Sequence, residues 1–205
     1  MKKNNMRALF LLLLAAAGLA FAPALEVLKI GDKMPLGNHA MTDVNGKTIT
    51  LQGSMGKHGI LIMFSCNTCP WVLKNQAATI EACKYAQANG IGMVVLNSNA
   101  AQHADKDSPE TMKTYATEQG YAWPYAIDQN ATVADSLGAK STPECYLFDA
   151  NQKLVYHGGI DDSPDKEAPV KIKHLIVAMA AVAGGSEVPN KTTRFKGCSI
   201  KRTVP

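Results

Sequence analysis

GILIMFSCNTCPW, residues 59–71, decides the fold, because an unbroken apolar run ends there in a Cys-x-x-Cys motif. An apolar run of this length is typical of a strand that is buried on both faces of a parallel or mixed sheet. Pro70 follows the second cysteine, and proline suits the first turn of a helix. The stretch therefore predicts a buried strand over 59–65, a helix beginning at 70, and two cysteines at the junction between them.

The rest of the chain predicts an alternation of strands and helices around this junction. Apolar residues at helical spacing extend the first helix to about residue 88, and a second buried strand over 91–97 completes a right-handed parallel crossover. The other expected elements are a hairpin around Asn45-Gly46, a helix over 109–119, a short strand over 125–128, a short helix over 132–137, a hairpin of 144–148 with 153–157, and a helix over 168–183. This order predicts an α/β domain with a central mixed sheet, helices on both faces and an N-terminal β-hairpin extension.

The N-terminus has the layout of a secretory signal peptide. Lys2, Lys3 and Arg7 precede a short apolar run over 8–21, and small residues follow it. We expect cleavage after Ala24, which leaves a domain over 25–183 and a basic C-terminal tail over 184–205. An uncleaved membrane anchor is the alternative, but a run of about 14 residues is shorter than the roughly 20 that span a bilayer. The sequence therefore predicts an exported, periplasmic protein that meets a membrane only if the signal is retained.

The charge balance disfavours nucleic acid as a partner. The chain has 205 residues, of which 46% are hydrophobic, and a formal net charge of +4. Three of its 21 basic residues stand in the signal segment, so 18 basic and 17 acidic residues remain, and the net charge of the body is +1. Phosphate binding needs clustered Lys and Arg, which a body this close to neutral does not offer.

Five cysteines follow the signal segment, namely Cys66, Cys69, Cys83, Cys145 and Cys198. An odd number cannot be fully paired within one chain, which favours a chemical use over a structural one. Free amides and the dipole at a helix N-terminus stabilise a thiolate, so we expect Cys66 to act as the nucleophile and Cys69 to resolve the mixed disulfide. The alternatives are a structural disulfide and half of a zinc site, but zinc needs two further ligands and no histidine stands at ligand spacing.

Five segments of the chain carry a resemblance to a known family. They are FSCNTCPW at 64–71, DSPETMKTYA at 107–116, Ser141-Thr142-Pro143, LFDANQKLVYHGGIDD at 147–162 and GCSIK at 197–201. In this order they resemble the thioredoxin-fold redoxins, and among them the peroxiredoxin-like thioredoxin family proteins, over nearly all of the chain after the signal. The resemblance implies a thioredoxin fold and thiol–disulfide oxidoreductase activity without a bound cofactor. The partners it implies are protein thiols or disulfides, a thioredoxin-type reductant, or peroxide.

The resemblance also implies a site around Pro143. This proline would be cis and would face the Cys66–Cys69 pair. The backbone of Thr142 would receive an extended substrate strand, which would then dock by strand pairing beside the disulfide. Trp71, directly after the cysteine motif, belongs to the same expected substrate-binding surface.

The chain departs from thioredoxin in two places near this site. Ser65 precedes the first cysteine where thioredoxin has Trp, and Ile60 stands where thioredoxin has a buried acid that assists the second cysteine. We expect Glu144 to take over this proton transfer, since a carboxylate near a dithiol can accept the proton of Cys69. The alternative is that Glu144 lies solvated at a sheet edge, as acids often do.

A thiol-dependent peroxidase is the alternative function. Cys69-Pro70 aligns with the peroxidatic Cys-Pro of true peroxiredoxins, which makes Cys69 the attacking thiol and Cys66 the resolving one. The Pro-x-x-x-Thr-x-x-Cys pattern of that family is not kept, since Ile62 stands at its proline and Cys66 at its threonine. Part of the group that would bind a peroxide is therefore missing.

A copper-binding protein is a non-enzymatic alternative. Cys66 and Cys69 are soft thiolate ligands, and His157 is the candidate for a third. The copper-delivery relatives of this fold carry three residues between their cysteines, so the spacing is unfavourable, and we expect no metal site.

The other three cysteines are expected in different environments. Cys83 lies on the apolar side of the first helix and is expected as a buried, inert thiol. Cys145, in the strand after Pro143, is expected in the core rather than near the site. Cys198 stands in the basic tail, which we interpret as a solvated extension. It is a candidate for an extra redox thiol, a partner for Cys145, or a free residue.

Overall fold

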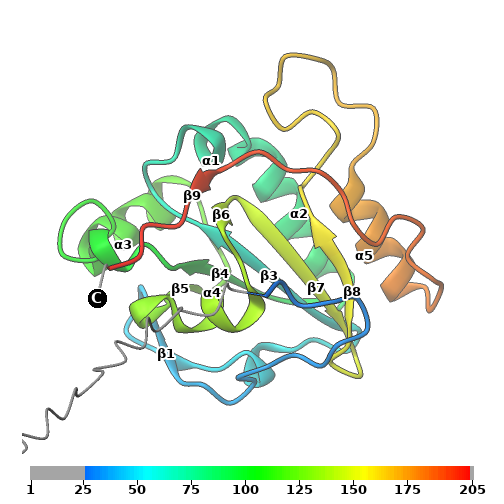
Figure 1. Ribbon diagram of the computed structural model, residues 1–205, viewed down its shortest axis with the longest axis horizontal. Coiled ribbons are helices and arrows are strands. Elements are labelled where there is room, and N and C mark those ends of the chain that lie inside the picture. Colours follow the sequence, from blue (N-terminus) through cyan, green and yellow to red (C-terminus); the bar gives the residue numbers. More distant parts are fainter. Residues whose placement is uncertain (1–25, 204–205) are drawn as a thin grey trace, which may run out of the picture.

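A seven-stranded mixed sheet forms the centre of the molecule (Figure 1). The computed structural model describes residues 26–203, so the predicted signal peptide over 1–24 lies outside the described residues. The strands, in sheet order, are β2 (Thr48–Ile49), β1 (Met41–Asp43), β5 (Tyr125–Ile127), β4 (Gly92–Asn97), β3 (Gly59–Ser65), β7 (Glu144–Asp149) and β8 (Leu154–Gly158). β5, β4 and β3 run parallel, and the other pairings are antiparallel. The predicted fold class, with the β1–β2 hairpin at one edge, is confirmed.

Strand β3 is buried on both faces, as its apolar run predicts. Its side chains alternate between the two sides of the sheet. Leu61 and Met63 belong to one hydrophobic core, and Ile60, Ile62 and Phe64 belong to the other. The strand that leads to the cysteine motif is therefore held from both sides.

Helices cover both faces of the sheet. α2 (Gln76–Ala88), α3 (Pro109–Glu118) and α5 (His174–Ala183) pack on one face, and α4 (Thr132–Leu137) packs on the other. α2 and α5 lie side by side (Figure 1). The connections hold α1 (Pro70–Lys74) and the 3-10 turns η1 (Gln52–Ser54), η2 (Ala100–Gln102) and η3 (Gln129–Ala131). Within residues 26–203, every helix is too short or too polar to cross a membrane.

Two helices differ from their predicted bounds. The helix predicted from 70 to 88 is divided into α1 and α2 at Asn75, whose side-chain amide donates to the carbonyl oxygen of Trp71. The helix predicted over 168–183 begins only at His174, because the backbone of residues 171–172 forms hydrogen bonds with Asp162 instead. Both differences arise from hydrogen bonds of individual polar groups, which the spacing of apolar residues does not report.

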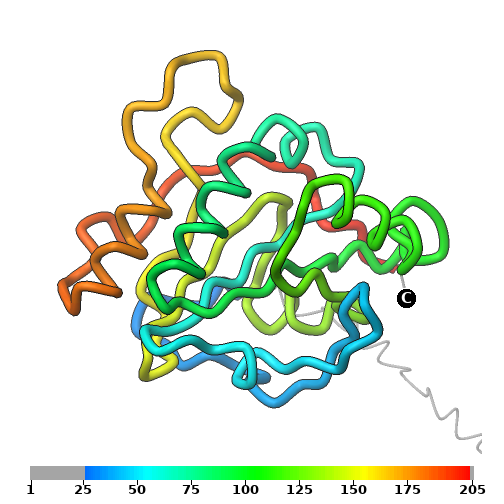
Figure 2. Tube along the Cα trace, turned by 180° about the vertical axis from the view of Figure 1, so that it is seen from behind, coloured from blue at the N-terminus to red at the C-terminus, as the bar shows by residue number. Residues whose placement is uncertain are grey.

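The C-terminal segment over residues 190–202, here called the strap, runs from α5 back across one end of the sheet (Figures 1 and 2). It bridges β8 where Thr192 pairs with His157. Its strand β9 (Cys198–Ser199) pairs with β6 (Ser141–Thr142) in a second, two-stranded sheet. The expectation of a solvated extension is wrong for this segment, because the strap pairs with distant strands. Its own sequence has no alternation of apolar and polar residues that would predict this pairing.

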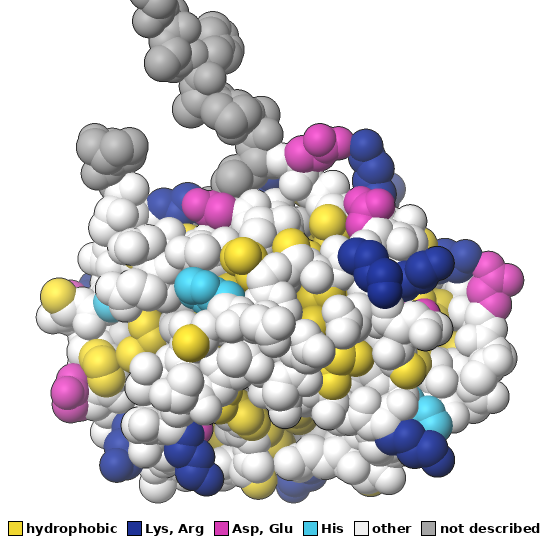
Figure 3. Space-filling model, turned by 90° about the horizontal axis from the view of Figure 1, so that it is seen from below, with side chains coloured by type: hydrophobic (Ala, Val, Ile, Leu, Met, Phe, Trp, Pro, Cys, Tyr) yellow, Lys and Arg dark blue, Asp and Glu magenta, His cyan; other side chains and the backbone are white. Residues whose placement is uncertain are grey.

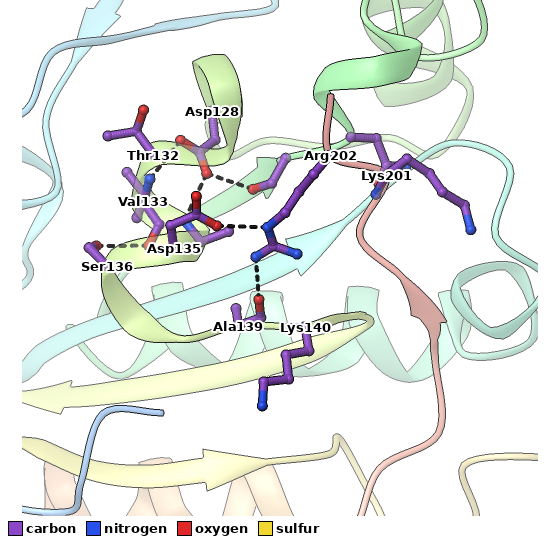
Figure 4. A network of polar contacts seen from close by, with 12 residues as sticks. Asp128, Thr132, Val133, Asp135, Ser136, Ala139, Lys140, Lys201 and Arg202 are labelled. Atoms are coloured by element: carbon purple, nitrogen blue, oxygen red, sulfur yellow. Dashed lines mark hydrogen bonds and ion pairs between the residues drawn. The ribbon is translucent and has the colours of Figure 1, made fainter. Parts of the chain in front are cut away.

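The end of the strap is anchored near α4 (Figure 4). The Nε of Arg202 lies 2.7 Å from Oδ1 of Asp135, and its Nη2 donates to the carbonyl oxygen of Ala139 at 2.7 Å. Ile200 is buried, and its amide donates to the carbonyl oxygen of Lys140. These contacts hold the residues that follow β9 against the body.

The charges of the body are mixed on the face that Figure 3 draws. Lys and Arg side chains lie interspersed with Asp and Glu side chains around the rim of the described part (Figure 3). Hydrophobic side chains show between them in small groups. Basic and acidic side chains therefore do not form separate patches on this face.

Candidate active site

The two cysteines of the motif lie at the junction between β3 and α1. β3 ends directly before Cys66, and Cys69 is the N-cap of α1 with φ −71° and ψ 122°. Both side chains are almost fully buried, with exposed fractions of 2% for Cys66 and 3% for Cys69. They form a small cluster with Val72, and Trp71 and Cys198 pack against it. The predicted strand-to-helix position of the motif is confirmed.

Thr142 contacts both cysteines, and its peptide bond to Pro143 is cis. The hydroxyl oxygen of Thr142 lies 3.5 Å from Sγ of Cys66. The Sγ of Cys69 lies 3.2 Å from the carbonyl oxygen of Thr142, to which it donates when protonated. The structure therefore has the cis bond that the resemblance implies, and the residue before it lies against both sulfurs.

The two thiols have opposite acidities. Hydrogen bonding from Cys66 lowers the pKa of Cys69 to about 4 against the effect of burial, and the Cys198 thiol and the Val72 amide act in the same direction. The same hydrogen bond, together with burial, raises the pKa of Cys66 far above its ordinary range. Cys69 is the residue that caps α1, and the nucleophilic role expected of Cys66 stays a prediction.

A buried polar network holds the loop between the cysteines. Asp107 is fully buried; its Oδ1 accepts from the amide of Asn67 at 3.0 Å, and its Oδ2 accepts from the side-chain amide of Asn99 at 2.9 Å. The hydroxyl of Tyr125 donates to Oδ1 of Asn67 at 2.9 Å and accepts from the side chain of Asn97 at 3.1 Å. Sequence reasoning missed this network. The signal available was an acid directly before the Ser-Pro start of α3, within a segment that already carried the family resemblance.

Glu144 is buried, with an exposed fraction of 1%, so the alternative of a solvated edge residue is wrong. Its carboxylate accepts from the amides of Lys140 and Ser141, the hydroxyl of Tyr146 and Nε2 of His157, at 2.8 to 2.9 Å. Burial would raise the pKa of Glu144, but these hydrogen bonds, first that of His157, lower it below its ordinary value. Within the described residues, these four groups are the hydrogen-bond donors to the Glu144 carboxylate. The arrangement fixes the backbone that leads into β6, and proton transfer by Glu144 stays a prediction.

His157, the third ligand of the copper alternative, is engaged elsewhere. Its Nε2 lies 2.8 Å from Oε1 of Glu144, and its ring stacks on Tyr146 with 4.4 Å between the ring centroids. Among the side chains of residues 26–203, no group of three or more His, Cys, Asp or Glu is arranged to hold a metal ion.

The remaining predicted residues divide between the site and the core. Trp71 lies beside the cysteine pair, and the ammonium groups of Lys74 and Lys196 lie 5.3 Å and 5.6 Å from its ring centroid. Cys83 and Cys145 are fully buried in one hydrophobic core, as expected. Cys198 packs on the Cys66–Cys69 cluster instead of this core, so the structure does not support the pairing of Cys198 with Cys145.

Solved structures similar to this chain share its fold over most of its length. An uncharacterized conserved protein from Geobacillus kaustophilus has 36% sequence identity and a TM-score of 0.80, covering 87% of this chain and 94% of its own. A hypothetical protein from Sinorhizobium meliloti has 29% identity and a TM-score of 0.80, covering 88% and 98%. The thioredoxin domain of a thiol-disulfide oxidoreductase from Bacteroides vulgatus has 21% identity and a TM-score of 0.51, covering 63% and 88%. Among curated proteins, none matches the chain.

The sheet order, the cis proline and the paired cysteines at a strand-to-helix junction define a protein of the thioredoxin fold. The model of the Redoxin family matches residues 29–171. The chain belongs to the Redoxin family, and a thiol redox function follows from that membership.

Proposed function

We propose that the protein is an exported thiol–disulfide oxidoreductase whose Cys66–Cys69 pair alternates between a dithiol and a disulfide. The observation that carries this proposal is the single buried cluster in which both sulfurs contact Thr142. Two sulfurs that lie within 3.5 Å of atoms of one residue are placed to form a disulfide with little rearrangement. The partner is a protein disulfide or dithiol, or a thioredoxin-type reductant.

Cys69 is the attacking thiol in this proposal, since it caps α1 and hydrogen bonding from Cys66 lowers its pKa. Its sulfur attacks a partner disulfide, and one partner sulfur leaves as a thiolate that takes up a proton. Cys66 then gives up its proton and attacks the Cys69 sulfur, which forms the Cys66–Cys69 disulfide and releases the second partner thiol. Two electrons pass to the partner, and no bound cofactor takes part. The order of attack is the reverse of the one expected from the sequence.

Cysteine variants test both the function and the order. With a partner disulfide, Cys66→Ser combined with Cys198→Ser should accumulate a mixed disulfide on Cys69, because no other thiol of the cluster is left to resolve it. Cys69→Ser should lose exchange altogether. The opposite pattern, trapping on Cys66, would restore the order expected from the sequence, and wild-type turnover in both variants would contradict the function. Peptide mapping without reduction identifies the trapped cysteine.

Peroxide reduction is a second candidate, which the acidity of Cys69 favours. The Cys69 thiolate would attack one peroxide oxygen, release water after protonation and become a sulfenic acid, which Cys66 would convert to the disulfide with loss of a second water. The rate at which the reduced mature protein reacts with hydrogen peroxide decides between the two. A rate far above that of a free thiol, with sulfenic acid at Cys69, supports a peroxidase. A rate no higher than that of a free thiol supports disulfide exchange alone.

Export rests on the signal-like N-terminus over 1–24. N-terminal sequencing of the protein purified from its cells tests it. A mature chain that begins at Leu25 supports periplasmic export, whereas a retained Met1 in a cytoplasmic fraction contradicts it.

A further inference from the structure

The edge of the active site beside Thr142 is occupied by the protein's own chain. β9 pairs antiparallel with β6, so that Cys198 stands opposite Thr142 and Ser199 opposite Ser141. Because Thr142 contacts both sulfurs of the motif, a strand paired with it delivers its own side chain to the dithiol. The residue delivered there is a cysteine, and it packs on the Cys66–Cys69 cluster.

The position of Cys198 is fixed on both sides. Before β9, the ammonium group of Lys196 lies 2.5 Å from Oδ2 of Asp165 and faces the Trp71 ring. After β9, the amide of Lys201 donates to the side chain of Asn99 at 2.8 Å, and its carbonyl accepts from the amide of residue 101 at 2.9 Å. Since Asn99 also bonds Asp107, the strap is tied to the network that holds the loop between the cysteines.

Gly197 allows the close approach of the strap to β6. A Cβ atom at this position would lie 2.6 Å from the carbonyl oxygen and 2.9 Å from the carbonyl carbon of Thr142, closer than real Cβ contacts come. The obstacle is backbone, so a larger side chain would push the strap away. The contact between Cys198 and the dithiol therefore depends on a glycine at 197.

We propose that Cys198 is a third redox thiol, which attacks the Cys69 sulfur of the Cys66–Cys69 disulfide and moves that disulfide into the strap. The proposal rests on the proposed function, because it needs the disulfide which that function forms. Cys198 loses its proton to solvent, the Cys69–Cys198 bond forms as the Cys66–Cys69 bond breaks, and Cys66 leaves as a thiolate that takes up a proton. Electrons are only redistributed, so the step needs no oxidant or reductant.

Transfer of the disulfide to Cys198 gives a dithiol reductant access to the oxidised form of a buried cysteine pair. Cys66 and Cys69 are almost fully buried, whereas Cys198 is half-buried. Burial and the neighbouring Cys69 sulfur raise the pKa of Cys198, while the Trp71 amide and Lys201 act in the opposite direction. Oxidation of Cys69 removes its charge, which makes Cys198 more acidic at the stage where it has to attack. The partner is thus a protein dithiol that reduces the disulfide at Cys198.

Disulfide mapping of the mature protein tests the proposal. The reduced protein is oxidised with a stoichiometric amount of glutathione disulfide, free thiols are blocked in acid, and peptides are analysed without reduction. We expect both the Cys66–Cys69 and the Cys69–Cys198 disulfides in the wild type, and the Cys69–Cys198 disulfide in Cys66→Ser. If Cys69 of the Cys66→Ser variant stays glutathionylated while Cys198 stays free, the third-thiol proposal is overturned. The proposed function is not affected by that result. A wild type that forms no Cys66–Cys69 disulfide would overturn the proposed function instead.

A second variant keeps all three thiols and changes only their contact. Gly197→Val should lower the share of the Cys69–Cys198 disulfide several-fold and raise the share of the Cys66–Cys69 disulfide by the amount lost. Thr203→Ala, in the exposed residues after the strap, is the matched control and should behave as the wild type. An unchanged Cys69–Cys198 share in Gly197→Val would show that the strand pairing does not deliver Cys198, and would overturn the proposal without any cysteine replacement.

Discussion

Cys69 caps helix α1, whereas Cys66 stands before its first turn. Hydrogen bonding between the two lowers the pKa of Cys69 and raises that of Cys66. The lowered pKa of Cys69 favours its thiolate in the dithiol form. The first cysteine of the motif regulates the acidity of the second.

Removing the Cys66 donor should change the acidity of Cys69. Cys66→Ala takes the hydrogen bond away, so we expect the pKa of Cys69 to rise from about 4 towards the ordinary range of a thiol. Cys66→Ser is the matched control, since its hydroxyl still donates, and its pKa should stay nearer the wild type. Because a lowered pKa favours the charged form, the ultraviolet absorbance of the wild-type thiolate should persist below neutrality and vanish near pH 4. Equal midpoints for Cys66→Ala and the wild type would exclude Cys66 as the donor.

The junction that holds the motif could be predicted because its determinants are local. The apolar run before Cys66 requires a strand buried on both faces, and Pro70 marks the first helical turn. Pro70 also implied that the residue before it is the N-cap, so the acidity of Cys69 could have been inferred from the same signal. The assignment to Cys66 rested on the free amides and the dipole at the helix N-terminus, which do not by themselves distinguish the two cysteines.

The strap and the Asp107 network could not be predicted, because their partners are distant in sequence. β9 has only two residues and no alternation of apolar and polar side chains, so nothing local marks Cys198 as part of a strand. Asp107 reads as an ordinary polar residue at the start of a helix, and only the fold brings Asn67 and Asn99 to it. Tertiary pairing decides both features.

The Asp107 carboxylate should contribute to stability through the loop it holds. Asp107→Ala leaves the donors of Asn67 and Asn99 without their acceptor, at a cost of about 1–3 kcal/mol for each buried unsatisfied group. Asp107→Asn keeps one acceptor oxygen and should lose less. Urea unfolding of the two variants, with the exposed Asp105→Ala as control, measures the difference. A free energy of unfolding for Asp107→Ala equal to that of the control would contradict this role.

The buried Glu144 should make stability depend on pH. Its pKa in the folded protein is lower than the ordinary 4.5, so its contribution is present above that value and is lost as the pH falls through the lowered pKa. At neutral pH we expect Glu144→Gln to lose about 1.5–3 kcal/mol for a hydrogen bond to the charged group, and the gap to the wild type to close in acid. Glu118→Gln, at an exposed position, is the control in urea unfolding at several pH values. A gap that does not change with pH would show that the carboxylate charge is not what stabilises β6.

The same variant tests whether Glu144 also moves the proton of Cys69. If Glu144 only positions β6, disulfide exchange by folded Glu144→Gln should keep the pH profile of the wild type. A profile that shifts, in conditions where the variant is fully folded, would support the proton transfer expected from the sequence.

Arg202 should govern how readily the strap opens. Its contacts with Asp135 and Ala139 are partly exposed, so Arg202→Ala should change the global free energy of unfolding by less than about 1 kcal/mol. Local opening is more sensitive than global unfolding, because Arg202 anchors the end of the strap. We therefore expect faster hydrogen exchange at the amide of Ile200, which bonds Lys140. Asp135→Ala removes the ion pair alone and should give a smaller increase. Since opening uncovers the edge beside Thr142, alkylation of Cys198 should accelerate in the same order. Protection of the Ile200 amide at the wild-type level in Arg202→Ala would place the anchor of the strap elsewhere.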